Sequence, residues 1–133
     1  SKMANTMQFD LVSPERRLAS LEVTSVQIPG ADGDMTAMPG HAAVLTSLRP
    51  GVVKVHSTEG EKDFVVTRGF AEVSAEAISV IAEHAHVGSE VTKSDLEDVL
   101  VTARKAVGEA SSEHKDAAEK FVADLVHLMD DMD

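Results

Sequence analysis

Apolar and polar residues alternate along much of the chain between residues 7 and 90. Residues 7–13 place Met7, Phe9 and Leu11 on one side, with Gln8 and Asp10 between them. Such period-2 alternation predicts a β-strand with one face in a core and the other in solvent. Runs rich in Val and Ile recur at intervals of about eight to twelve residues, which is typical of all-β domains. We expect further strands at residues 18–28, 35–37, 52–57, 63–68, 69–74 and 77–83.

Turns rich in glycine and proline separate these runs. Residues 29–34 are predicted to form a tight loop, and two Pro-Gly pairs enclose an apolar run within residues 38–51. Proline fixes φ and glycine accepts positive φ, so such pairs hold a short segment rigidly. No connection is long enough for a crossover helix, which favours antiparallel pairing. The pattern predicts an antiparallel β-sandwich or barrel over residues 7–90.

A helical pattern replaces the alternation at Thr92. Apolar residues recur every three or four positions over residues 96–107 and again over residues 118–132. This spacing places one apolar stripe along each helix. The break between the two segments is too short for anything except an antiparallel arrangement. We therefore expect a helical hairpin over residues 91–133.

Polar residues and a glycine predict where these helices begin and end. Ser94 and Glu97 have the spacing of a capping box, in which each side chain accepts a hydrogen bond from the other residue's backbone. Gly108 is a natural C-terminal cap, and Ser111 and Ser112 are natural N-terminal caps.

The predicted fold class is thus α+β, with an N-terminal antiparallel β-sandwich followed by a C-terminal antiparallel two-helix hairpin. We expect two domains, residues 7–90 and residues 91–133. Residues 1–6 are expected to be a disordered start, because Ser1 and Lys2 ahead of Met3 look like a cloning remnant.

Composition and charge narrow the classes of function. The chain has 133 residues, a formal net charge of −11 and no cysteine. The acidic balance disfavours nucleic acid and anionic lipid surfaces, because binding phosphates requires clustered Lys and Arg. The missing cysteines exclude disulfides, thiolate metal sites and cysteine nucleophiles. No apolar run of about 18 residues is present, so we expect no insertion into the membrane and see no signal peptide.

Three motifs invite a chemical interpretation, and each has a simpler one. His41 has the side chain of a general base, but no Ser or Asp partner is suggested, which favours a turn or interface histidine. His84 and His86 have the spacing of a metal pair without a third ligand. Asp32 and Asp34 lack the rest of a calcium loop, which favours a plain turn. We expect neither catalysis nor a metal or cofactor.

Several segments together resemble the epsilon subunit of bacterial F-type ATP synthases, which is the delta subunit in mitochondria. The combination of Met38-Pro-Gly-His-Ala-Ala-Val-Leu-Thr46 with Leu48-Arg-Pro-Gly51 is specific, and the resemblance covers nearly the whole chain. The other segments that carry it are residues 7–16, residues 26–34, Phe64-Val-Val-Thr-Arg-Gly-Phe-Ala-Glu-Val73 and Val80-Ile-Ala-Glu83.

The resemblance implies a function that the residues alone do not indicate. Such subunits are non-catalytic parts of the central stalk, bind the gamma subunit and the c ring, and rotate to couple proton flow to ATP synthesis. It implies a peripheral place at the cytoplasmic face of the bacterial inner membrane and contacts of the hairpin with alpha or beta subunits. By similarity, the residues that face the c ring and gamma are Gly30, Ala31, Asp32, Gly33, Asp34, Met38, Pro39, Gly40 and His41.

The tail departs from the pattern of the family. Members that bind ATP carry an Ile/Leu-Asp-x-x-Arg-Ala motif in the first helix. In the register that starts at Leu96, Glu97 replaces the Asp, and in the register that starts at Leu100, Val101 does. Neither register restores the motif, which argues against nucleotide binding by the tail. Residues 129–133 include three aspartates and would be repelled by the acidic beta-subunit loop that inhibitory members use, so we expect weak or absent ATPase inhibition.

A second class of function stays open at this point. A β-sandwich with short loops is also typical of a stand-alone module that binds a small ligand or a nucleotide. Stable association with a coiled-coil gamma partner distinguishes the rotor subunit from such a module.

Overall fold

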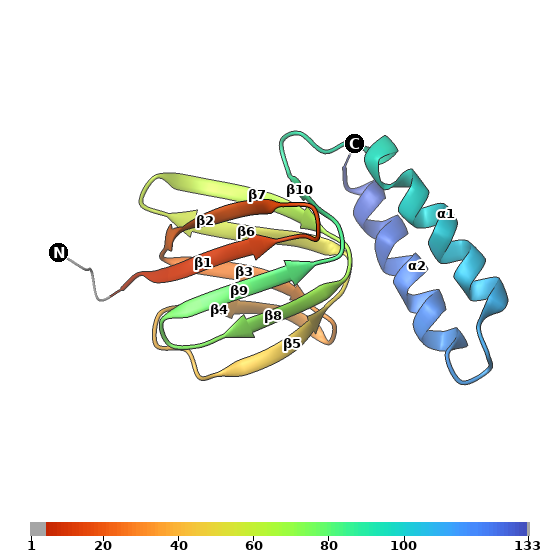
Figure 1. Cartoon of the computed structure of the whole chain (residues 1–133), viewed down its shortest axis with the longest axis horizontal. Coiled ribbons are helices and arrows are strands. Elements are labelled where there is room, and N and C mark those ends of the chain that lie inside the picture. The colour runs from red at the N-terminus through yellow and green to blue at the C-terminus, as the bar shows by residue number, and fades with distance from the viewer. Residues whose placement is uncertain (1–4, 133) are drawn as a thin grey trace. The chain divides into compact units, whose positions relative to one another are not determined.

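The computed structural model describes residues 5–132 as ten strands followed by two helices (Figure 1). Residues 1–4 of the predicted disordered start, and Asp133, lie outside the described residues. The elements are β1 (Met7–Val12), β2 (Arg17–Val23), β3 (Ser25–Gly30), β4 (Gly33–Ala37), β5 (Val44–Leu48), β6 (Gly51–Ser57), β7 (Gly60–Val66), β8 (Gly69–Val73), β9 (Ala77–Ala82), β10 (Ala85–Val87), α1 (Lys93–Glu109) and α2 (Lys115–Asp130).

The strands form one continuous hydrogen-bonded path that folds over into two layers. Its order is β10-β7-β6-β3-β5-β8-β9-β1-β2, and β4 pairs with β3 outside this path. Strand β3 connects β10-β7-β6 on one side of the path with β5-β8-β9-β1-β2 on the other, because Ser25 to Gln27 pair with β6 and Gly30 pairs with Leu48 of β5. This arrangement agrees with the predicted fold class, a β-sandwich followed by two helices.

One pairing contradicts the prediction of purely antiparallel strands. Strands β1 and β9 run parallel, with Phe9 opposite Ile78 and Leu11 opposite Val80. The prediction rested on short connections, which force antiparallel pairing only between consecutive strands. Here β2 to β8 lie between the two partners in the chain, so no connection restricts their relative direction.

The single strand predicted at residues 18–28 is also wrong. It is divided into β2 and β3 at Thr24, whose backbone N–H donates to the His56 carbonyl at 2.7 Å and whose hydroxyl donates to the same oxygen at 3.0 Å. In one regular strand Val23 and Val26 would face opposite sides, yet both are fully buried. The break at Thr24 shifts the phase of the alternation and lets both valines reach the core.

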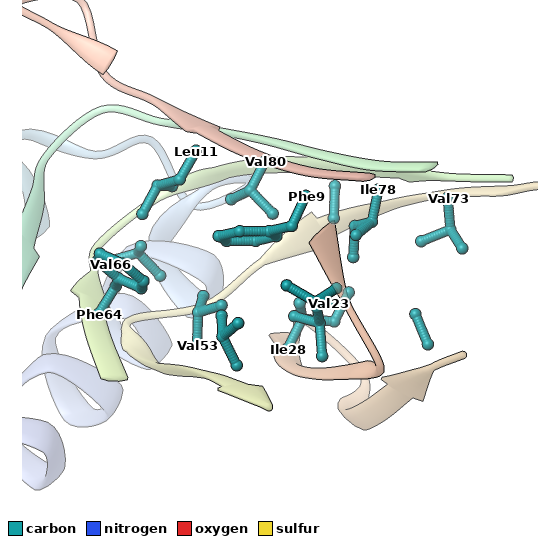
Figure 2. Close-up of a cluster of buried hydrophobic side chains, with 14 of the residues drawn as sticks. Phe9, Leu11, Val23, Ile28, Val53, Phe64, Val66, Val73, Ile78 and Val80 are labelled. Carbon is teal, nitrogen blue, oxygen red and sulfur yellow. The ribbon is translucent and has the colours of Figure 1, made fainter. Parts of the chain in front are cut away.

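The core of the sandwich lies between the two layers and is mostly aliphatic. Phe9, Leu11 and Val80 point toward Val53, Phe64 and Val66 of the facing layer (Figure 2). The rings of Phe9 and Phe64 lie 6.1 Å apart between centroids at an interplanar angle of 35°, within the range of favourable aromatic pairs. Both rings are almost completely buried, so this pair packs inside the core.

Two compact units make up the chain, Ser1–Ser89 and Glu90–Asp133. In the second unit α1 and α2 lie side by side and antiparallel, as predicted (Figure 1). Leu96 and Ala103 of α1 are buried, as are residues on one stripe of α2. Among residues 5–132 neither helix is long and apolar enough to cross a membrane.

The caps of these helices differ from the prediction. Thr92, not Ser94, caps α1: its hydroxyl accepts from the Asp95 backbone N–H at 3.4 Å, while the Asp95 carboxylate accepts from the Thr92 N–H at 2.9 Å. Aspartate therefore takes the place that the prediction gave to glutamate. Helix α1 also runs past Gly108 to Glu109, and α2 starts after His114 without a side-chain cap instead of at Ser111 or Ser112.

Candidate partner-contact site

Residues 30–34, the first group of predicted contact residues, form the tip of the β3–β4 hairpin. The predicted loop is shorter than expected, since Gly30 pairs with Gly33 across a turn of only Ala31 and Asp32. A Cβ on Gly30 would lie 2.6 Å from the Gly33 carbonyl oxygen, so only glycine lets the two strands approach this closely. The tip is therefore a tight, two-residue turn.

Arg49 holds this tip in place. Its Nη1 donates to the Gly30 carbonyl at 2.5 Å, and its Nη2 pairs with Asp34 Oδ1 at 2.5 Å. The other oxygen of Asp34 accepts from Gln27 Nε2 at 3.2 Å. Both carboxylate oxygens of Asp34 are thus engaged within the chain, and one guanidinium contacts both sides of the hairpin.

Backbone hydrogen bonds fasten the same tip to the neighbouring strand. The Ala31 N–H donates to the Ser47 carbonyl at 2.8 Å, and the Arg49 N–H donates to the Pro29 carbonyl at 2.9 Å. The hairpin tip is consequently attached to the end of β5 and to the turn that follows it.

Residues 38–41, the second group, form a separate turn. The His41 N–H donates to the Met38 carbonyl at 3.0 Å, and the Gly40 N–H donates to the Ala75 carbonyl at 2.9 Å. Gly40 has a φ of +88°, which glycine adopts without strain. His41 Nδ1 lies 2.7 Å from the Ala42 carbonyl oxygen, so this ring nitrogen donates to the backbone beside the turn.

The structure does not bring the two groups together. Asp34 lies near the start of β4, whereas Met38 follows the end of β4. Likewise, the hairpin tip contacts the end of β5, whereas residues 38–41 precede the start of β5. Strand β5 has five residues. At about 3.3 Å per residue, the two groups are therefore separated by roughly 16 Å along the sheet.

Large apolar side chains occupy the outer face of the sheet between these groups. Leu45 is 68% exposed, Phe70 55% and Ile81 56%. Phe70 lies directly opposite Ile81 on β9 and opposite Ser47 on β5. Leu45 is two residues before Ser47 and therefore faces the same side, so Leu45, Phe70 and Ile81 share one face of the sheet. We call these three residues the β5–β8–β9 patch. Exposed clusters of this kind on a sheet are typical of interaction sites.

This patch was not predicted from the sequence, although the sequence carries a signal for it. In each strand a patch residue stands beside another apolar residue, as in Phe70-Ala71 and Val80-Ile81. Ala71 and Val80 are fully buried while their neighbours face outward. Adjacent apolar residues in a strand therefore mark a sheet that is apolar on both faces.

The motifs considered for metal binding do not form a metal site in the described part of the chain. Within residues 5–132 no group of three or more His, Cys, Asp or Glu side chains is arranged to hold an ion. His84 is exposed and His86 belongs to β10, where it pairs with Val65. Asp32 and Asp34 belong to the hairpin tip described above.

Residues 6–88 match the family model of the ATP synthase delta/epsilon chain, beta-sandwich domain. The sandwich is thus of the delta/epsilon class. Among curated relatives, the chain is 53% identical over 125 residues to the ATP synthase epsilon chain of Jannaschia sp. (strain CCS1), covering 94% of this chain and 95% of that one. It is 54% identical over 132 residues to that of Ruegeria sp. (strain TM1040), covering 95% and 96%. The chain belongs to the ATP synthase epsilon chain family, and the resemblance stated above is confirmed.

Solved structures share the fold. A chain of the Euglena gracilis mitochondrial ATP synthase, solved as an OSCP/F1/c-ring assembly, matches with a TM-score of 0.71 at 19% identity, covering 98% of this chain and 83% of that one. A chain of the Tetrahymena thermophila mitochondrial ATP synthase central stalk and c ring matches with a TM-score of 0.67 at 20% identity, covering 94% of each. At these identities the likeness shows the fold.

Proposed function

We propose that this chain is a non-catalytic rotor subunit of the central stalk, which binds the gamma subunit and the c ring and couples proton flow to ATP synthesis. It would act as a peripheral subunit at the cytoplasmic face of the bacterial inner membrane. Its membership of the epsilon chain family supports this role. The observation that carries the proposal is the β5–β8–β9 patch with a predicted contact group at either end.

The patch is suited to the gamma subunit. Three large apolar side chains project from β5, β8 and β9, which are hydrogen-bonded to one another along their length, so little order has to be gained on binding. Met38, itself 56% exposed, extends the apolar surface at the end where β5 begins. Residues 38–41 and the patch thus offer gamma one rigid, largely apolar face.

The hairpin tip is suited to the c ring. It carries Asp32 and Asp34 on a two-residue turn that Arg49 and the backbone of β5 hold in place. A subunit that transmits torque needs contacts that do not yield under load. A short, clamped turn with acidic residues meets that need and complements polar or basic loops of the c ring.

We also propose that the helical hairpin, through which the chain would contact the alpha or beta subunits, inhibits ATP hydrolysis weakly or not at all. The exposed residues Asp130 and Asp131 end α2, and the only basic residue in its last turn is His127. An acidic loop would be repelled by this terminus. Adding the full chain to ATPase depleted of this subunit should change hydrolysis little, and strong inhibition that disappears on deleting residues 91–133 would contradict the proposal.

Co-purification with the gamma subunit tests the main proposal. The variant Leu45→Ser/Phe70→Ser/Ile81→Ser should fold and lose gamma, because it removes exposed apolar side chains without touching the core. The control is Val101→Ser, which changes an equally exposed residue (66%) on α1 and should retain gamma. Retention of gamma by the triple variant would refute the role of the patch. A wild-type chain that binds nucleotide but no gamma would favour the stand-alone module.

A further inference from the structure

The hairpin tip carries two acidic residues, but they are not equivalent. We propose that Asp32 alone presents the negative charge of the tip to the c ring, while Asp34 and Arg49 form an internal clamp that positions it. This inference rests on the proposed function, whose c-ring contact it resolves to single residues.

The charge of Asp34 is balanced within the chain. Its Oδ1 pairs with Arg49 Nη2 at 2.5 Å and its Oδ2 accepts from Gln27 Nε2 at 3.2 Å. The side chain of Arg49 is only 28% exposed, and the other terminal nitrogen of its guanidinium donates to the Gly30 carbonyl. A cation that approached Asp34 would be repelled by the Arg49 guanidinium already paired with it. Asp34 is therefore a poor contact for an incoming cation.

Asp32 has the opposite environment. It is exposed at the apex of the turn and forms no hydrogen bond or ion pair with any of residues 5–132. Its carboxylate is free to meet a basic or polar group without breaking a contact within the chain. Its backbone lies between Ala31, which is bonded to Ser47, and Gly33, which pairs with Gly30. Because Arg49 of the clamp donates to the Gly30 carbonyl, the clamp helps to fix the position of this charge.

Arginine is specifically suited to the clamp. Its planar head has separate N–H groups that reach Gly30 on β3 and Asp34 on β4 at the same time. A lysine has one ammonium on a flexible stem and would keep the charge without bridging both strands. The variant Arg49→Lys therefore separates positioning from charge.

Binding of the c ring at several salt concentrations tests the assignment of charge. The complex of the full chain with gamma is titrated with detergent-solubilised c ring. Asp32→Asn should lower the affinity at least fivefold at low salt and flatten its salt dependence. Asp34→Asn/Arg49→Gln leaves the net charge unchanged and should preserve the salt dependence. Glu59→Gln, at the exposed turn between β6 and β7, is the control and should change neither.

Amide hydrogen exchange tests the clamp. Arg49→Lys should speed exchange at Ala31 and Gly33 and weaken c-ring binding, while Asp32→Asn should leave that exchange as in the wild type. The inference is overturned if the double variant, and not Asp32→Asn, flattens the salt dependence, or if Arg49→Lys leaves exchange unchanged. A wild-type complex that retains gamma but binds no c ring would instead refute the proposed c-ring contact itself.

Discussion

Replacing Thr67 with valine should stabilise the protein. Thr67 follows β7, is fully buried, and its hydroxyl oxygen has no hydrogen-bond partner among residues 5–132. Its backbone N–H donates to the His84 carbonyl at 3.1 Å, a bond that the substitution leaves intact. Valine has nearly the same shape as threonine, so the change replaces an unsatisfied polar group with a methyl group.

The magnitude follows from the cost of burying an unpaired hydroxyl, which is about 1–3 kcal/mol in proteins. We expect the free energy of unfolding to rise by about 1 kcal/mol, the lower end of this range. For a chain of this size that corresponds to a rise in Tm of roughly 3–5 °C. Thr67→Ser is the matched control: it keeps the hydroxyl, removes a buried methyl, and should destabilise by about 1 kcal/mol.

The assay is urea or thermal unfolding of the full chain. Because the chain has no Trp and no Tyr, far-UV circular dichroism or calorimetry is the suitable readout. A loss of stability of more than about 1 kcal/mol in Thr67→Val would refute the reasoning, because it would mean that the hydroxyl is satisfied in solution. Stabilisation by both variants would also contradict it, since the methyl group would then be strained and not packed.

Two further pairs of substitutions test two glycines and the N-terminal cap of α1. Gly69→Ala should destabilise the protein by about 3 kcal/mol or more in thermal unfolding, because Gly69 has a φ of +158° and an added Cβ would overlap the Ile81 carbonyl oxygen. Gly108→Ala should instead stabilise it by up to about 1 kcal/mol, because Gly108 lies in α1 with open space around it. Thr92→Ala should cost about 1 kcal/mol and lower the helical circular dichroism, while Ser94→Ala should cost little; the reverse order would restore Ser94 as the cap.

Local patterns in the sequence were sufficient for most of the elements. Alternation over residues 7–12 predicts β1, and the spacing of three and four over residues 96–107 predicts α1, because both periods arise from the geometry of a single element. The turn at residues 29–34 was placed correctly and made too long. Proline and glycine are compatible with both a strand end and a loop, so the sequence did not show that Pro29 and Gly30 end β3.

The contacts that form the candidate site could not be predicted from local patterns in the sequence. Its nine residues came from resemblance to a family, and their contacts with partners stay a prediction. The bond between Arg49 and Asp34 could not be predicted from the sequence, because fifteen positions separate the two residues. The β5–β8–β9 patch joins β5 to β8 and β9 although β6 and β7 lie between them in the chain, so its existence depends on the pairing of β5 with β8.

The sequence by itself determined the kinds of element, their order and the family, since these depend on the periodicity of side chains, on turn residues and on short segments of consecutive residues. Only the tertiary structure decided the parallel pairing of β1 with β9, the break at Thr24 and the separation of the two contact groups. Each of these depends on which distant strands share hydrogen bonds, and many pairings are compatible with the same local pattern. Burial of the Phe9 and Phe64 rings in one core selects among them.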